Sequence, residues 1–418
     1  MQCRNFNEFK QSLESGKDES PFQRSDAGLH ILIHESVDDL DPERWNSISQ
    51  NQSIFLQTDY IRAMEASFHG ELEYRFACFF ENGVLVGIAA FQITHCETPD
   101  LSSNLNGENK IISWFARLFS NDNGVLRFNI MVLGNAFASG EHGFVFRPEI
   151  DGQRAYQAVL DAVEIIRERE KEREERISAV LVKDFYPESF ELCNTFANEN
   201  YHEFLVDPNM IMPLRPEWTT YEDYLASLTT KYRTKAKSAF KKSAGLRLET
   251  LGTEEISHYQ KEIEYLYSQV HDKADFKVGK MNFEAFVNLS AYLGDRFFFK
   301  ALFLEERMVG FLTGFEYAGM LDAHFVGIDY ELNLEHAIYP RMLYEYVIEG
   351  INRKAQKISF GRTAMEIKST VGAFPVDLKC FIRHRHAAPN HLLKVLFNFI
   401  KPSNFDQKVP YKKEAGVF

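Results

Sequence analysis

The chain of 418 residues is longer than one hydrophobic core usually supports, so two domains are the first expectation. Apolar residues make up 45% of the composition, and the 37 phenylalanines predict thick aromatic cores and exclude a largely disordered chain. A net charge of −13 argues against a surface that binds DNA or anionic membranes over its whole extent, although it is compatible with local basic patches.

The cysteines and the apolar runs narrow the cellular context. The five cysteines are scattered, odd in number and form no CxxC pair, which disfavours zinc and a disulfide framework and fits a reducing compartment. No apolar run reaches the roughly 18 residues expected of a spanning helix. Residues 5–25 lack the apolar region of a signal peptide. We therefore predict a cytoplasmic protein without a metal site.

The first part of the chain alternates strand-like and helix-like segments. Residues 1–27 are polar and are predicted to be loosely ordered, and residues 97–110 are predicted to be a Ser/Asn-rich loop. The remaining segments follow the periods of strands and helices. They are a strand at 29–34, helices near 41–48 and 53–68, a hairpin at 74–93 with an Asn-Gly turn, a strand at 128–133, a helix at 154–176, a strand at 177–183, a helix at 191–200 and a strand at 210–214.

A basic helix is predicted over residues 221–245, and Gly245 ends it. One face is an apolar stripe, and the other face carries six cations. These are Lys231, Arg233, Lys235, Lys237, Lys241 and Lys242. On an acidic protein, such a concentrated positive patch favours a polyanion as ligand: coenzyme A, a phosphorylated lipid precursor or the acceptor arm of a tRNA. A solvated helix face is the alternative.

Residues 297–343 carry the clearest pattern in the chain. Three strand-like runs, at 297–304, 308–317 and 321–328, are joined by short turns and predict an antiparallel meander. A polar loop at 329–338 leads to an amphipathic helix that begins near Pro340. This order places a helix N-terminus beside the end of a central strand, where free N–H groups and the helix dipole suit a phosphate or an oxyanion.

The two parts of the chain repeat one pattern at a constant offset of 223 residues. Residues 74–88 align with residues 297–311, and Val86-Gly87 matches Val309-Gly310. The predicted helices before the two hairpins fall in the same register. The economical interpretation is two copies of one α/β unit in tandem, although any two hairpins share some likeness.

Two motifs carry a resemblance to a known family. The first reads Tyr232-Arg233-x-Lys235-x-Lys237, followed by Lys241-Lys242 and Gly245. The second reads Phe360-Gly361-Arg362-Thr363-x-x-Glu366-x-Lys368-x-x-x-Gly372-Ala373. Together with the meander, they resemble the FemAB-like, peptidoglycan-bridge-type branch of the GNAT acyltransferase superfamily. The resemblance covers roughly residues 30–385 and is clearer in the second half.

The resemblance implies a fold and an activity. The expected fold is a mixed α/β sheet built from two tandem GNAT-like units, residues 28–215 and 216–385, followed by a tail at 386–418. The family moves an acyl or aminoacyl group onto an amine. Acyl-CoA, acyl carrier protein or aminoacyl-tRNA would be the donor and a small or lipid-linked amine the acceptor, in cell-envelope or lipid metabolism, with no covalently bound cofactor. The alternative is a degenerate GNAT pair that binds a ligand or partner without catalysis.

One departure bears on the donor. Simple acetyltransferases of this superfamily carry a Gly-rich loop before the helix that holds the pyrophosphate. Here residues 330–339 contain no glycine. This difference puts close backbone approach to a pyrophosphate, and acetyl-CoA as donor, in question.

Candidate site residues come from the meander, the basic helix and the second motif. The predicted catalytic residues are Asp329, His336, Tyr339 and Glu366, because transfer to an amine needs a proton acceptor and no covalent nucleophile. The predicted substrate- or cofactor-binding residues are Lys231, Arg233, Lys235, His324, Arg341, Arg362 and Lys368. Structural alternatives stay open: a core role for His324, packing for Tyr339, and an ion-pair network for Arg362, Glu366 and Lys368.

The tail contains an apolar segment at residues 390–400. It is predicted to dock on the body of the protein. A peripheral contact with a membrane is the alternative, and would suit a lipid-linked substrate.

Overall fold

A computed structural model describes residues 23–49, 52–97, 127–273, 280–397 and 402–412. The predicted loop at 97–110 and most of the predicted N-terminal segment therefore lie outside the described residues. We use "first half" and "second half" as names for the parts of the chain on either side of residue 215.

The first half contains the following elements, in chain order. Its strands are β1 (Gln23–Arg24), β2 (His30–His34), β3 (Leu72–Glu81), β4 (Val84–Glu97), β5 (Arg127–Leu133), β6 (Phe144–Phe146), β7 (Ile177–Phe185) and β8 (His202–Pro213). Its helices are α2 (Pro42–Ser49), α3 (Thr58–Ser67), α6 (Gly152–Glu172) and α7 (Phe190–Asn198).

The second half contains the predicted meander at its centre. Its strands are β9 (Leu246–Thr250), β10 (Phe297–Leu304), β11 (Arg307–Tyr317), β12 (Met320–Ile328), β13 (Lys357–Ser359) and β14 (Phe374–His384). Its helices are α8 (Tyr221–Ser227), α9 (Thr230–Lys242), α10 (Thr253–His258), α11 (Gln260–Asp272), α12 (Phe283–Leu293), α13 (Tyr330–His336), α14 (Ile338–Asn352), α15 (Met365–Val371) and α16 (Ala387–Phe397).

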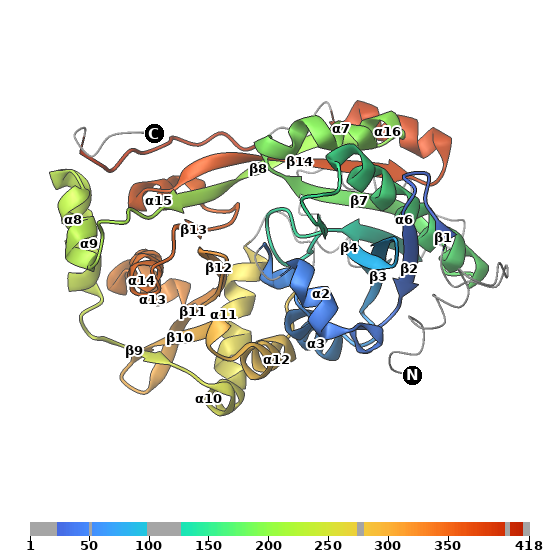
Figure 1. The fold of residues 1–418 in the computed structure, drawn as a ribbon. Coiled ribbons are helices and arrows are strands. Elements are labelled where there is room, and N and C mark those ends of the chain that lie inside the picture. The colour runs from blue at the N-terminus through green and yellow to red at the C-terminus, as the bar shows by residue number, and fades with distance from the viewer. Residues whose placement is uncertain (1–22, 50–51, 98–126, 274–279, 398–401, 413–418) are drawn as a thin grey trace.

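One continuous sheet joins the two halves, in the strand order β1-β2-β3-β4-β5-β7-β14-β8-β13-β12-β11-β10-β9. The halves exchange a strand at the centre. β14 lies between β7 and β8, and β8 lies between β14 and β13, so each half completes the sheet of the other. In Figure 1 these two long strands run side by side along the top of the view.

Helices cover both faces of the sheet, because side chains alternate between its faces along each strand. One face packs against α2 and α3 of the first half and α10, α11 and α12 of the second, and their apolar side chains form a single core. The other face packs against α6 and α7 in the first half and against α8, α9, α14 and α15 in the second. Asn288 of α12 donates to Ser67 Oγ of α3 at 2.9 Å across this shared core.

The predicted repeat is present in the structure. The β3–β4 and β10–β11 hairpins each follow a helix, and each contains a shift of register, between Phe79 and Phe80 and between Leu302 and Phe303. The two shifts are separated by the same offset as the sequence alignment. Gly87 and Gly310 match because a Cβ atom would collide with Phe146 at 2.3 Å in one half and with Met342 at 2.5 Å in the other.

Three predicted elements need correction. The single helix expected at 221–245 is two helices, because Leu228 is extended and pairs with Tyr411 in a β-bridge. The loop expected at 329–338 is largely the helix α13, because the carboxylate of Asp329 caps it by accepting from the N–H groups of Glu331 and Leu332. The strand expected at 210–214 is also longer, since β8 begins at His202.

The tail forms α16, which packs on β8 and β14, and the ring of Phe397 stacks on Phe204 with centroids 4.2 Å apart. The predicted docking is thus confirmed for residues 387–397. No helix in the described part of the chain has both the length and the apolar character needed to cross a membrane.

Candidate functional site

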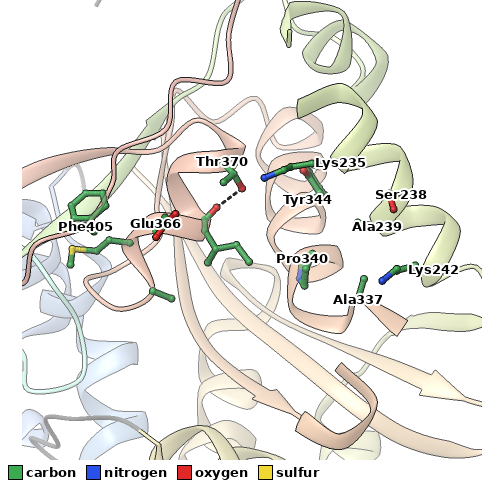
Figure 2. Close-up of a pocket in the computed structure, with 13 residues that line it drawn as sticks. Lys235, Ser238, Ala239, Lys242, Ala337, Pro340, Tyr344, Glu366, Thr370 and Phe405 are labelled. Atoms are coloured by element: carbon green, nitrogen blue, oxygen red, sulfur yellow. Dashed lines mark hydrogen bonds between the residues drawn. The ribbon is translucent and has the colours of Figure 1, made fainter. Parts of the chain in front are cut away.

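A pocket of about 760 Å³ opens on the second half of the molecule. Its walls are α9, the start of α14, α15 with the turn before it, and Phe405 from the C-terminal segment (Figure 2). Within the described residues, no group of three or more His, Cys, Asp or Glu side chains is placed to hold a metal ion.

Two neighbouring strands part below the helices α14 and α15, which follow them along the chain and line the pocket. β13 pairs in parallel with β12 over only three residues, Met320–Asp322, whereas β12 continues to Ile328. The chain after β12 forms α13 and α14, and the chain after β13 leads to α15. The two groups of helices start from diverging strands, which leaves the space between α14 and α15 open.

The edge of β12 changes at the same place. A bulge interrupts the pairing of β11 and β12, where the hydroxyl of Thr313 accepts from the N–H of Phe325 at 3.0 Å and donates to its C=O at 3.1 Å. Residues 323–326 are half-buried rather than covered by a neighbouring strand. This edge therefore offers backbone groups to a ligand that enters between the strands.

The N-terminal end of α14 faces the pocket. Ala337 precedes the helix in the left-handed region at φ 49°, and the side chain of Asn333 accepts from the N–H of Tyr339 at 2.8 Å. Ala337 and Pro340 line the pocket, and the first turn of this 15-residue helix has no acidic residue. The positive end of the helix dipole thus adds to any cation nearby and favours an anion.

Three charged side chains line the pocket. Lys235 and Lys242 come from α9, and Glu366 comes from the first turn of α15. Figure 2 shows the amino group of Lys235 directed toward Thr370 on the opposite wall. Lys242 also donates to the C=O of Leu334 at 3.4 Å, which holds it near the end of α13. The pocket therefore combines two cations and a helix N-terminus with one carboxylate.

The predicted catalytic residues do not form one cluster. Asp329 is 1% exposed, caps α13 and forms an ion pair with Arg307, so its carboxylate has structural partners. His336 ends α13, with its ring 3.9 Å from Glu335. Tyr339 precedes Pro340, and burial raises the pKa of its phenol. Of the four, Glu366 alone lines the pocket, and their catalytic roles stay predictions.

The predicted binding residues on the basic helix have different surroundings. Lys231 and Lys235 lie over the ring of Tyr232 at 5.4 and 5.5 Å from its centroid, but of Lys231, Arg233 and Lys235 the pocket is lined by Lys235 only. Arg341 pairs with Glu345 at 2.5 Å and lies 4.2 Å from the centroid of Phe240. Arg341 therefore joins α14 to α9 rather than facing the pocket with a free guanidinium.

Lys368 belongs to a buried polar cluster at the parting of β12 and β13. Its amino group donates to the C=O groups of Phe360, at 2.5 Å, and of Gly361, at 3.4 Å. Burial lowers the pKa of Lys368 to about 7, against the raising effect of the carboxylate of Asp322. Burial raises the pKa of Asp322 to about 7, against the hydrogen bond from Ser359 and the charge of Lys368. Burial thus acts against the charged form of both groups.

His324 and Arg362 lie where the two halves meet. The side chain of His324 is 3% exposed, with Nδ1 3.9 Å from Asp322, and its ring lies 6.1 Å from that of Phe55 of the first half. Arg362 pairs across the halves with the fully buried Asp184 at 3.5 Å. Arg362 and Lys368 therefore already have protein partners, and their roles in binding stay predictions.

The described residues of the first half hold a smaller cavity near the end of β7. The amino group of Lys183 in β7 donates to the C=O groups of Asn135 and Ala138, both at 2.7 Å, and pairs with Asp184 at 2.5 Å. The cavity beside it has a volume of about 30 Å³ and is lined in part by Glu141 and Lys183. The described part of the first half thus repeats the strand frame with a far smaller cavity beside β7.

Sequence reasoning missed Asp322, Lys183 and Asp184. A signal existed for all three, since each is a charged residue inside a run of strand formers, where burial demands a partner. The partners could not be read from the sequence, because they come from elements such as α15 and the loop at 134–143, far from each residue along the chain.

No family model and no curated protein matches the sequence. Among solved structures, FemX aligns with 85% of this chain and 98% of its own, at 11% identity and a TM-score of 0.54. A tandem GNAT protein from the clavulanic acid biosynthesis pathway aligns with 85% of this chain and 98% of its own, at 10% identity and a TM-score of 0.47. L-PGS from Bacillus licheniformis aligns with 86% and 97%, at 9% identity and a TM-score of 0.44.

At such low identity, the likeness to FemX shows a common fold and leaves the substrate open. The predicted fold class, a mixed α/β sheet in two GNAT-like units, is confirmed. The resemblance to the FemAB-like branch is confirmed at the level of the fold.

Proposed function

We propose that the protein transfers an activated acyl or aminoacyl group to an amine and forms an amide. The observation that carries the proposal is the open pocket between α9, α14 and α15, where a helix N-terminus meets two lysines. The alternative is a pair of units that binds a ligand without catalysis. Its support is the absence of glycine from residues 330–339 and the structural partners of Asp329.

In this proposal the pocket holds the donor. Lys235, Lys242 and the start of α14 bind its phosphate groups, and the edge of β12 orients its carbonyl group. The amine nitrogen attacks the carbonyl carbon, the C–S bond of a thioester or the C–O bond of an aminoacyl ester breaks, and the nitrogen gives up one proton. Acyl-CoA, acyl carrier protein and aminoacyl-tRNA are the donors to test, and a small or lipid-linked amine is the acceptor.

The proton acceptor has three candidates. Glu366 lines the pocket, and Tyr339 adjoins Pro340, which also lines it. The pair Asp322–Lys368 is the third, because the two groups are buried together where the strands part, and burial raises the pKa of the carboxyl and lowers that of the amine. The raised pKa of Tyr339 keeps its phenol protonated at neutral pH, so Glu366 and the buried pair are the proposed acceptors.

Amide formation tests the proposal directly. The purified protein is incubated with acyl-CoA, acyl carrier protein loaded with an acyl group, or aminoacyl-tRNA, each with a mixture of amines. Mass spectrometry then identifies any amide, and released thiol is measured for the thioesters. We expect an amide from one donor class, and a large loss of it in Glu366→Gln or Asp322→Asn.

The outcomes separate the two functions. Donor binding without amide formation in every mixture would favour the non-catalytic alternative. Neither binding nor amide formation by the folded protein would contradict both uses of the pocket.

A further inference from the structure

The C-terminal segment 402–412, here called the strap, is attached along the second half at several points. It returns from α16 along the top of Figure 1 to α15. Ser403 N–H donates to Asp207 of β8 at 2.7 Å, and Lys408 N–H donates to the hydroxyl of Ser369 in α15 at 3.0 Å. At its end, the N–H of Thr229 donates to the C=O of Pro410 at 2.9 Å. The strap therefore connects α15 to the start of α9, two opposite walls of the pocket.

Tyr411 anchors the strap. Tyr411 is 8% exposed. Its ring centroid lies 6.0 Å from the ring centroid of Trp218 and 5.1 Å from the guanidinium of Arg215. The Tyr411 hydroxyl lies over Gly372, where a Cβ atom would come within 1.9 Å of its oxygen. Gly372 belongs to the second sequence motif, and the strap gives a reason for a glycine there. The anchor shows that the strap packs on a surface shaped for it.

The strap reaches the pocket through two side chains. Phe405 forms part of the lining, and Lys408 Nζ lies 3.2 Å from Oε1 of Glu366. Lys408 also pairs with Asp406 of the strap. Glu366 is the carboxylate among the lining residues and would repel an anionic ligand. Because Glu366 pairs with Lys408, its negative charge opposes the positive potential of Lys235 and Lys242 less strongly.

We infer that the strap is a functional wall of the pocket. Lys408 offsets the negative charge of Glu366, so that the pocket accepts an anionic ligand. The inference rests on the proposed use of the pocket for a phosphate-bearing donor. The strap lies outside both GNAT-like units, and its residues would set the affinity of the pocket for this ligand. Glu366 would then have a second effect, since its pairing with Lys408 couples ligand affinity to the docking of the strap.

The test is a double-mutant cycle with inorganic pyrophosphate as the probe, measured by calorimetry on the full chain at low salt. Lys408→Gln should weaken binding about fivefold, the size expected of one exposed charge interaction. In a Glu366→Gln background the same change should have an effect of less than about twofold. Lys412→Gln is the matched control, because it removes the same charge from the strap at an exposed position, whereas Lys408 is the strap lysine that pairs with Glu366.

Each outcome decides the inference. Equal losses in Lys408→Gln and Lys412→Gln, no loss in Lys408→Gln, or no binding of pyrophosphate to the wild type would overturn it. The proposed function is judged separately by amide formation. If the protein forms an amide but Lys408→Gln binds pyrophosphate as the wild type does, the proposed function holds and the inference about the strap fails. If the double-mutant cycle gives the predicted result but no amide forms, the inference holds and the proposed function fails.

Discussion

The two halves of the molecule use one strand frame in opposite ways. In the second half, the space after the parting strands is an open pocket of about 760 Å³. In the described part of the first half, the cavity beside Lys183 and the loop at 134–143 has a volume of only about 30 Å³. The difference arises in the segments after the strands, because the hairpins and their register shifts match at a fixed offset.

Buried charged side chains differ in their surroundings between the two halves. In the first half, Lys183 and Asp184 satisfy one another and the loop, so the charges hold structure together. In the second half, Asp322 and Lys368 have pKa values near neutrality, and Lys235 and Lys242 face an open space. We therefore expect changes in the first half to alter stability and changes in the second half to alter binding.

The largest expected effect is on stability, from Lys183→Met. This change leaves Asp184 buried without its closest cation and removes the donor to two carbonyl groups. We expect the free energy of unfolding in urea to fall by about 3–5 kcal/mol. Pyrophosphate binding by the protein that remains folded should be unchanged. A decrease in the free energy of unfolding of less than about 1 kcal/mol would contradict the structural role of Lys183. Weaker pyrophosphate binding without a loss of stability would contradict it as well.

The next effect concerns pH and the contact between the halves. Burial lowers the pKa of His142 to about 4 and that of His324 to about 3, and both rings contact Phe55. A folded-state pKa below the unfolded value means that the stabilising contribution is complete above about pH 6.5. It is lost as pH falls through 6.5 toward 4. For His142 this loss is about 3 kcal/mol.

The measurement is urea unfolding at several pH values between 7 and 4.5. His142→Gln should flatten the decline, whereas His69→Gln, at an exposed position, should leave it as in the wild type. Parallel curves for wild type and His142→Gln would contradict the account of this contact.

A smaller effect distinguishes the two sides of the basic helix. Lys235→Glu with Lys242→Glu places negative charge in the pocket, whereas Lys237→Glu with Lys241→Glu makes the same change in net charge at exposed positions outside the pocket lining. We expect the first pair to weaken donor binding about tenfold or more and the second pair about twofold. Equal losses would indicate a diffuse electrostatic effect instead of a site.

The smallest effect is expected from Asp329→Asn. Asparagine keeps the capping role at the start of α13, and the lost ion pair with the exposed side of Arg307 costs up to about 1 kcal/mol. The rate of amide formation should stay within about threefold of the wild type. A loss of a hundredfold or more would instead restore Asp329 as a general base.

The sequence allowed the repeated hairpins and the meander to be predicted, because alternating side chains and short turns are local signals. It did not reveal the exchange of β8 and β14, since their pairing depends on the arrangement of both halves. Of the predicted site, Lys235 and Glu366 line the pocket, whereas Arg341 and Arg362 have partners on other elements. An ion pair between distant segments leaves no pattern in one sequence.

The most direct measurement is the stoichiometry of donor binding by native mass spectrometry, with acyl-CoA and with a short RNA helix carrying a stable aminoacyl group at its 3′ end. Ser238 is exposed on α9 and lines the pocket, so Ser238→Trp should fill it without disturbing the core, and Ser238→Ala is the control. The account predicts one donor per chain, retained in Ser238→Ala and lost in Ser238→Trp. Two donors per chain, or one that Ser238→Trp still binds, would contradict it.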